Sequence, residues 1–239
     1  DYSGGFLSLW SALEVLSLKT IGNNDLEQVS GTVLPILQLK YFASTINDFS
    51  KKIKAALPAE SYERLLIAVT IGDSEIEKIS AFILLEEYKD LREEYCKQLS
   101  SYPVLRHRIH TLSDAAKEKK ALLNMSEKYR ERVGWHLSRI YRTRNSLVHS
   151  GDIPRNIRYL GEHLHFYLDL IMLESFEKLS CGVQFCELDN ALLDSLLACE
   201  VLKKQLNKKE RVTVDDIQTL INPIFTKQDK FEYVCNCEP

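Results

Sequence analysis

The segment YRTRNSLVHSGDIP, residues 141–154, contains the side chains of this chain that are best suited to chemistry on a phosphate. Arg144 offers a planar, permanently charged fork that matches phosphate oxygens. His149 can move protons near neutral pH. Asn145 lies four residues before His149, so the two stack on one side of a helix. These residue types at this spacing predict a site that binds a phosphate ester and transfers protons.

Two interpretations of these residues are open. In the first, Arg144 forms an ion pair with an acidic residue of another helix, for which Glu14 is the candidate, and His149 is a surface residue at a helix end. In the second, Arg144 and His149 converge on one phosphate group. The residue types fit both interpretations.

The helix that carries this segment is predicted to bury an apolar stripe with Arg144 in its middle. With an advance of about 100° per residue, six side chains fall within about 60° of Arg144: Val133, Leu137, Ile140, Tyr141, Leu147 and Val148. A guanidinium at a core position costs several kcal/mol unless it is paired or partly hydrated. We therefore expect Arg144 to have a partner.

The same angles separate the two candidate catalytic side chains. His149 lies about 140° from Arg144 and Arg142 about 160°, while Trp135 lies directly opposite Arg144. One straight helix cannot direct Arg144 and His149 at one atom. We expect either that the helix loosens at its end, next to Gly151, or that a second chain completes the site across a two-fold interface.

The positive charge of the chain is concentrated around this segment. Residues 101–160 contain 13 Lys and Arg against 5 Asp and Glu, a net +8 in a chain whose overall net charge is −3. A basic block in an otherwise acidic chain is typical of a polyanion-binding surface, and it is also compatible with a solvated helix face.

Composition and periodicity predict an all-α protein that folds as an antiparallel helical bundle with extra helices. The 239 residues can bury a substantial core, and only 9 are Gly and 6 Pro. The apolar period is helical nearly throughout. No run approaches about 18 uninterrupted apolar residues and the N-terminus lacks a basic region, so we expect neither a membrane span nor a secretory signal. A cytoplasmic location follows as an expectation.

The expected helices position the segment at the end of one of them. Gly151 and Pro154 predict that this helix, over 125–149, stops at the segment, and the short connection predicts that the next helix packs antiparallel to it. The other helices are expected at 6–19, 32–57, from about 58, 73–99, 101–123, 155–179 and 189–209, with a short one in the tail. We expect a helical core over 1–180 and a C-terminal helical extension over 181–239, packed on that core.

Metal and cofactor sites are not expected. The six cysteines, at 96, 181, 186, 199, 235 and 237, lack the paired C-x-x-C spacing of zinc sites, so we interpret them as reduced thiols. His163 and His165 are two residues apart and face about 200° from each other on a helix, which does not favour a chelate.

Two stretches resemble the HEPN superfamily. Arg144 to His149, RNSLVH, resembles its R-x(4–6)-H motif in the common R-N-x-x-x-H form, preceded by the aromatic-rich GWHLSRIYRTRN and followed by a glycine. The opening FLSLWSALEVL resembles the first helix of ApeA-like HEPN domains, and LHFYLDLIMLESF supplies a further long helix after the motif. The order and separation of these stretches extend over most of the chain.

The resemblance implies a bundle that dimerises through the motif helices and acts as a metal-independent endoribonuclease. The implied reaction is attack of the RNA 2′-OH on the adjacent phosphate, which leaves a 2′,3′-cyclic phosphate and a 5′-OH. His149 would transfer protons and Arg144 would stabilise charge on the phosphorane. Asn145 would orient the histidine or bind the phosphate. Glu14 would pair with or tune Arg144, and Arg142 would support the site.

The resemblance also implies partners and a role. RNA is the expected substrate, with contacts from Arg139, Arg155, Arg158, Arg106 and Arg108. A homodimer, a regulatory or sensor domain and an antitoxin are the other expected partners, and a toxin or antiviral defence effector is the expected role. The alternative is a catalytically silent HEPN-like module for dimerisation or docking.

The chain departs from two patterns of the family. The E-x-x-x-K-R motif of some members is incomplete here, since Lys19 follows Glu14 at a longer spacing and no Arg follows it. Position 151 is Gly instead of the Tyr that is adenylylated in toxins silenced in that way, which argues against that form of antitoxin pairing.

Overall fold

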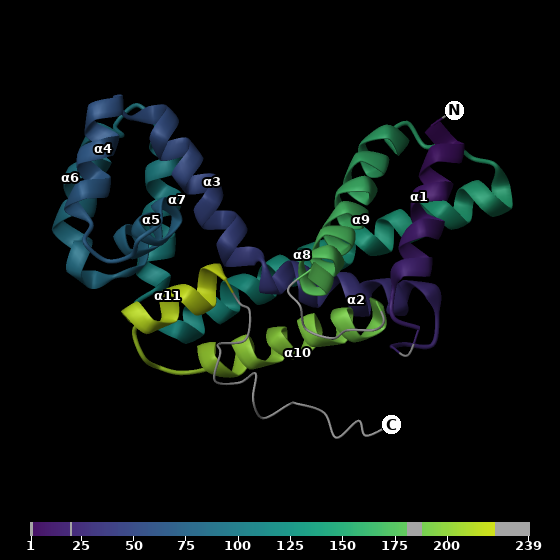
Figure 1. Ribbon diagram of the computed structural model, residues 1–239. Helices are drawn as coiled ribbons and strands as arrows, with labels where there is room; N and C mark the ends of the chain where they lie inside the picture. The colour runs from purple at the N-terminus through teal and green to yellow at the C-terminus, as the bar shows by residue number, and fades with distance from the viewer. Residues whose placement is uncertain (1, 20, 181–187, 223–239) are drawn as a thin grey trace, which may run out of the picture. The chain divides into compact units, whose positions relative to one another are not determined.

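Every regular element in the described part of the chain is a helix. The computed structural model describes residues 2–19, 21–180 and 188–222, and Figure 1 shows their arrangement along the chain. The elements are α1 (Tyr2–Leu16), α2 (Asp25–Leu39), α3 (Tyr41–Ala56), α4 (Ala59–Ala68), α5 (Glu75–Leu84), the 3-10 helix η1 (Glu86–Tyr88), α6 (Lys89–Gln98), α7 (Pro103–Ala115), α8 (Lys119–Ser150), α9 (Ile157–Ser180), α10 (Leu188–Leu206) and α11 (Val214–Ile221). The all-α prediction is confirmed. None of the described helices has the length and apolar character needed to cross a membrane.

The chain divides into two compact units. Unit 1 comprises residues 1–39 and 126–199, and unit 2 comprises residues 40–125 and 200–239. This division differs from the expected boundary at residue 180. The reason is that α8 and α10 each contribute one end to each unit, so both units contain segments that are far apart in the sequence.

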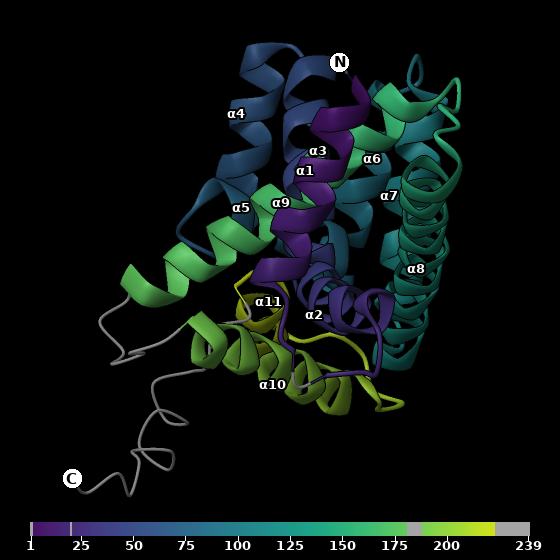
Figure 2. The ribbon, with the colours of Figure 1, turned by 90° about the vertical axis from the view of Figure 1, so that its right-hand side faces the viewer.

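Unit 1 contains the predicted motif and is built on α1, α2, α9 and the C-terminal part of α8. α1 packs across α9, and α2 contacts both (Figure 2). The core side chains recur every three or four residues along each helix, as an amphipathic helix requires. They include Phe6, Trp10, Leu13, Val33, Ile36, Leu137, Ile140, Leu160, Leu164 and Ile171.

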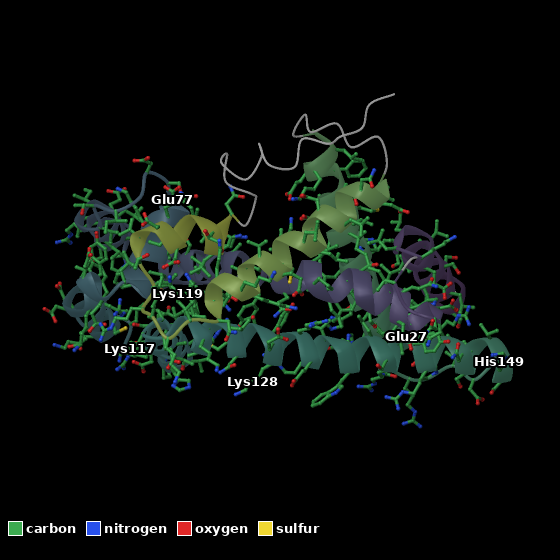
Figure 3. The ribbon with its side chains drawn as sticks, turned by 90° about the horizontal axis from the view of Figure 1, so that it is seen from below. Glu27, Glu77, Lys117, Lys119, Lys128 and His149 are labelled. Atoms are coloured by element: carbon green, nitrogen blue, oxygen red, sulfur yellow. The ribbon has the colours of Figure 1, made fainter. Side chains whose placement is uncertain are left out.

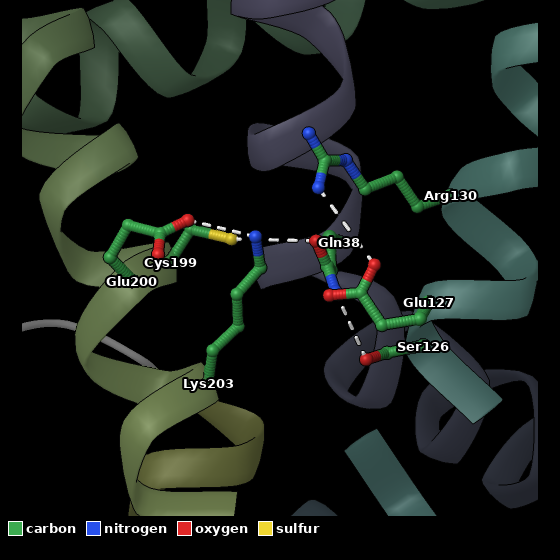
Figure 4. Close-up of polar contacts among 7 residues, drawn as sticks. All are labelled: Gln38, Ser126, Glu127, Arg130, Cys199, Glu200 and Lys203. Atoms are coloured by element: carbon green, nitrogen blue, oxygen red, sulfur yellow. Dashed lines mark hydrogen bonds and ion pairs between the residues drawn. The ribbon is translucent and has the colours of Figure 1, made fainter. Parts of the chain in front are cut away.

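The end of α2 is fixed within unit 1 by Gln38. Its side-chain amide is buried and donates to Ser126 Oγ at 3.3 Å and to Glu127 Oε1 at 2.9 Å, both on α8 (Figure 4). The Cys199 thiol of α10 lies 3.8 Å from the Gln38 carbonyl oxygen. Because a buried amide without partners is costly, these contacts tie three helices of the unit together at one point.

The end of α8 forms as the sequence predicts. The helix continues through Ser150, Gly151 adopts a φ of +69°, and its N–H donates to the Leu147 carbonyl at 3.2 Å. A left-handed backbone conformation directly after the last helical turn favours glycine. α9 begins after a six-residue connection, and its first half contacts α8 where the His136 ring meets the rings of His163 and Tyr167.

Three segments that were expected as single helices are divided. In the segment 101–123, α7 stops at Ala115 and α8 begins at Lys119, ahead of the expected start at residue 125. The helix expected over 32–57 begins at Asp25 and breaks at Lys40, so Pro35 lies inside α2 and not in a first turn. The helix expected over 73–99 begins with a Ser74–Glu77 capping box but stops at Leu85, whose backbone is extended. Apolar periodicity does not reveal such breaks, because the period resumes on the far side.

Candidate active site

Arg144 lies on the side of α8 that faces α1, where it has the partner that the sequence predicted. Its Nη2 is 3.7 Å from Glu14 Oε1, and its Nη1 donates to Asn145 Oδ1 at 3.0 Å. The side chains of Arg144 and Glu14 are 26% and 22% exposed. The pair is therefore partly exposed to solvent, and the guanidinium keeps N–H donors that solvent or a ligand can reach.

Glu14 is held in place by α1 itself. The indole Nε1 of Trp10, one turn earlier on α1, donates to the same Glu14 Oε1. Trp10 is completely buried, and its ring lies 5.5 Å from that of Tyr141 on α8. Because the carboxylate accepts from a rigid, buried donor, its position beside Arg144 follows from the packing of the core.

His149 lies on a different side of α8 from Arg144. It is exposed, and α8 is helical through Ser150, past the histidine. The prediction that the helix loosens at this end is therefore wrong, because the last turn closes regularly onto Gly151. In a regular helix the two side chains diverge by about 140°, so a single chain does not bring them to one atom.

The apolar stripe ends before the motif does. Leu147 is buried as predicted, but Val148 is 52% exposed, and Ile153 in the following connection is also exposed. The prediction that Val148 belongs to the core is wrong for the isolated chain. The last turn of α8 therefore exposes apolar surface at Val148, the residue before His149.

Three of the five arginines predicted to contact RNA, Arg139, Arg155 and Arg158, lie with the motif in unit 1, as does Arg142, which was predicted to support the site. Arg139, Arg142 and Arg155 are exposed and form no ion pair with the described residues. Arg158 is exposed and pairs with Glu162 at 3.2 Å, one turn further along α9. Exposed pairs of this kind contribute little to stability, so Arg158 remains available to a stronger anionic partner.

The other two predicted arginines lie on α7 of unit 2. Arg108 contacts Asp48 at 3.1 Å and its guanidinium lies 4.9 Å from the Phe49 ring centroid. Arg106 has a buried Nε without a hydrogen-bond partner. The structure does not bring these two arginines into the unit that holds the motif, and Arg108 already has local partners.

The sequence did not single out His136 as a functional candidate. Its Nδ1 lies 2.9 Å from the Tyr167 hydroxyl, its ring is 4.6 Å from that of His163, and its buried Nε2 has no partner. Burial lowers the pKa of His136, and the nearby His163 and Arg139 lower it further. A neutral ring is therefore favoured at this contact between α8 and α9.

No grouping of three or more His, Cys, Asp or Glu side chains among the described residues could hold a metal ion. Cys96 and Cys199 are buried free thiols, and burial raises the pKa of Cys96. The other four cysteines lie outside the described residues. His165 pairs with Asp169 at 2.9 Å, on the exposed side of α9.

Comparisons with known protein families, with curated proteins and with solved structures find no match to this chain.

Proposed function

We propose that this protein is a metal-independent endoribonuclease of the HEPN kind, which cleaves RNA by attack of the 2′-OH on the adjacent phosphate. The observation that carries the proposal is the partly exposed guanidinium of Arg144, held by Glu14 and Asn145 in the R-N-x-x-x-H segment. A guanidinium held in this way can neutralise charge that develops on a phosphorane without reorganising at that moment.

The proposed reaction needs one proton acceptor and one proton donor. The 2′-oxygen forms a bond to phosphorus and loses its proton, while the bond from phosphorus to the 5′-oxygen breaks and that oxygen gains a proton. The products are a 2′,3′-cyclic phosphate and a 5′-OH. A neutral His149 can accept the first proton, and a protonated His149 can supply the second. Two copies of the histidine therefore satisfy both steps.

A homodimer through the motif helices supplies the second histidine. The divergence of Arg144 and His149 on one regular helix requires a group from another chain if both are to reach one phosphate. Val148, next to His149 in the sequence, and Ile153, in the connection after α8, are exposed and offer apolar surface for such a contact. A role as a toxin or defence effector in the cytoplasm rests on analogy with the family.

The second candidate is a catalytically silent HEPN-like module for dimerisation or docking. It is favoured by a row of exposed apolar side chains along α9: Tyr159, Phe166, Leu173 and Phe176. In this case the contact of Arg144 with Glu14 serves only to hold α8 against α1.

Cleavage of RNA separates the two candidates. The full chain is incubated with single-stranded RNA in EDTA, beside Arg144→Ala and His149→Ala. We expect each variant to lower the cleavage rate about 10²- to 10⁴-fold, as loss of an acid–base or charge-stabilising group does. Product ends are identified by their sensitivity to phosphatase and kinase.

The matched controls are Arg64→Ala and His165→Ala. Arg64 pairs with Glu60, and His165 with Asp169, in exposed contacts one turn apart on their own helices. We expect both controls to cleave like the wild type. Equal cleavage by all variants, or no cleavage by the wild-type dimer, would exclude the catalytic proposal.

A further inference from the structure

The outer face of α8 in unit 1 carries a continuous row of polar side chains with one tryptophan. The residues are Lys128, Arg132, Trp135, Arg139, Arg142, Ser146 and His149, spaced alternately four and three apart. This spacing keeps a row on one face of a helix, and it extends for about 31 Å at 1.5 Å per residue. We call these seven residues the outer row. Figure 3 shows Lys128 and His149, its two ends, along α8.

The cations of the outer row are free to meet a partner. Lys128, Arg132, Arg139 and Arg142 are exposed and form no ion pair with the described residues. The Nε atoms of Arg132 and Arg142 each donate to the carbonyl one turn earlier, at 3.3 Å. The two terminal nitrogens of each guanidinium, with four N–H donors, form no hydrogen bond with the described residues.

The outer face of α8 carries a strong excess of positive charge. Among the residues next to the outer row, Glu131 is an exposed acid, so four cations stand against one carboxylate on this stretch of α8. Glu127 is partly buried and contacts Gln38 and Arg130 on another side of the helix. An unpaired row of cations raises the local concentration of a polyanion and accelerates its association.

Trp135 gives the outer row a second recognition element. It is 72% exposed, whereas the other tryptophan, Trp10, is completely buried. Arg132 lies one turn before Trp135 on the same face and Arg139 one turn after it. An exposed indole between two arginines can stack one base while the guanidiniums contact the phosphates on either side of it.

Other occupants fit this face less well. A second copy of the same face would bring two rows of unpaired cations together, which is unfavourable unless anions intervene. An anionic membrane surface also attracts cations, but interfacial helices insert a broad apolar face, and Trp135 is the one large apolar side chain of the outer row. A polyanion with unstacked planar groups satisfies both features.

We propose that the outer row of α8 is a binding track for single-stranded nucleic acid, in which Trp135 stacks a base. The track ends at His149, so a bound strand leads to the candidate active site. The inference rests on the proposed function only in naming RNA as the strand; the stacking and the phosphate contacts do not depend on cleavage.

Binding is measured apart from cleavage with a fluorescein-labelled RNA 12-mer of mixed sequence, methylated at every 2′-oxygen. This probe lacks the nucleophile, so anisotropy reports binding to the wild-type full chain. We expect Trp135→Ala to weaken binding about 5- to 100-fold, the range for loss of one stacked base, and Trp135→Phe to retain most of it. Duplex RNA, whose bases are already stacked, should show no dependence on Trp135.

The phosphate contacts are tested with the triple variant Arg132→Gln, Arg139→Gln, Arg142→Gln. We expect the slope of log affinity against log salt to become shallower by about 2, since each contact with a single strand contributes about 0.7. The matched control replaces Lys51, Lys89 and Lys97, three exposed lysines of unit 2, by Gln. It removes the same charge and should leave the slope unchanged.

The outcomes separate this inference from the proposed function. Wild-type binding that depends on Trp135 and on the three arginines supports the track even if no RNA is cleaved. Equal affinity for single-stranded DNA supports it too, while removing the assignment to RNA. The track is excluded if Trp135→Ala and the triple variant bind like the wild type, or if the control triple weakens binding as much. Preferential binding to phosphatidylserine vesicles through the same residues excludes it as well.

Discussion

Two arginines, one in each unit, differ in how far they are buried and in the groups that they contact. Arg92 of unit 2 is 4% exposed, and its Nη1 donates to the carbonyls of Phe82 at 2.5 Å and Leu85 at 3.1 Å. Arg144 of unit 1 is partly exposed, and its nearest acid is 3.7 Å away. Arg92 satisfies the carbonyls left open where α5 stops, whereas Arg144 keeps donors for a ligand.

Four further cations, two in each unit, also differ in whether they have an acidic partner. In unit 2, the nearly buried Lys119 side chain lies 2.8 Å from Asp216, and Arg108 contacts Asp48. In unit 1, Arg139 and Arg142 are exposed and form no ion pair with the described residues. A cation whose donors are used within its own unit has a structural role, whereas the donors of an unpaired row of cations are available to an external anion.

The largest effect that tests this contrast is expected from Arg92→Leu. Removal of the guanidinium leaves the Phe82 carbonyl without this donor and the Leu85 carbonyl with only the long bond from the Tyr88 N–H, at 3.4 Å. Each lost hydrogen bond to a charged group costs about 1.5–3 kcal/mol. We expect the local stability of unit 2 to fall by about 2–5 kcal/mol. Amide hydrogen exchange in α5 and α6 should then accelerate at least about 30-fold.

Arg92→Lys is the control for this prediction. A lysine keeps one charged donor and restores part of the stability, although it lacks the fork that reaches two carbonyls. Burial lowers the pKa of Arg92, and the same burial would disfavour a charged lysine at this position. If Arg92→Leu leaves exchange in α5 and α6 unchanged, the structural assignment of Arg92 is wrong.

A smaller effect is expected from Glu14→Ala compared with Glu14→Gln. Alanine removes the acceptor of the buried Trp10 indole, which costs about 1–3 kcal/mol. Glutamine keeps an acceptor and removes only the charge beside Arg144, where a partly exposed pair contributes about 0–1 kcal/mol. Urea unfolding followed by tryptophan fluorescence measures both, since Trp10 and Trp135 lie in unit 1.

The cleavage rates of the two Glu14 variants test whether Glu14 positions Arg144. If Glu14 positions Arg144, both variants lower cleavage, and both do so less than Arg144→Ala. Equal stability of Glu14→Ala and the wild type would contradict the observed contact between Trp10 and Glu14.

The smallest effect is a pH dependence of the stability of unit 1. Burial holds the pKa of His136 below its ordinary value of 6.5, so the unfolded chain binds a proton more readily than the folded one. The contribution of His136 to stability is complete above pH 6.5 and is lost as the pH falls through its lowered pKa. We expect His136→Gln to flatten the dependence of the urea midpoint on pH in this window, whereas His110→Gln, an exposed position of unit 2, should not.

Much of the local structure could be predicted from the sequence, because its decisive features involve residues that are close together in the chain. The end of α8 follows from Gly151, the capping box of α5 from Ser74 and Glu77, and the opposite directions of Arg144 and Trp135 from the helical period. Even the pairing of Arg144 with Glu14 could be predicted, because a guanidinium in an apolar stripe requires an acid from another helix.

Packing between distant parts of the chain determines what covers each face and which segments share a unit. Val148 has the same helical phase as the buried stripe, yet it is exposed, because burial depends on the neighbouring helices and not on phase. Arg106 and Arg139 belong to one basic block in the sequence, yet they lie in different units, because α8 leaves one core and enters another. A periodic pattern specifies the face that a helix must bury, whereas the path of the whole chain determines the partner that buries it.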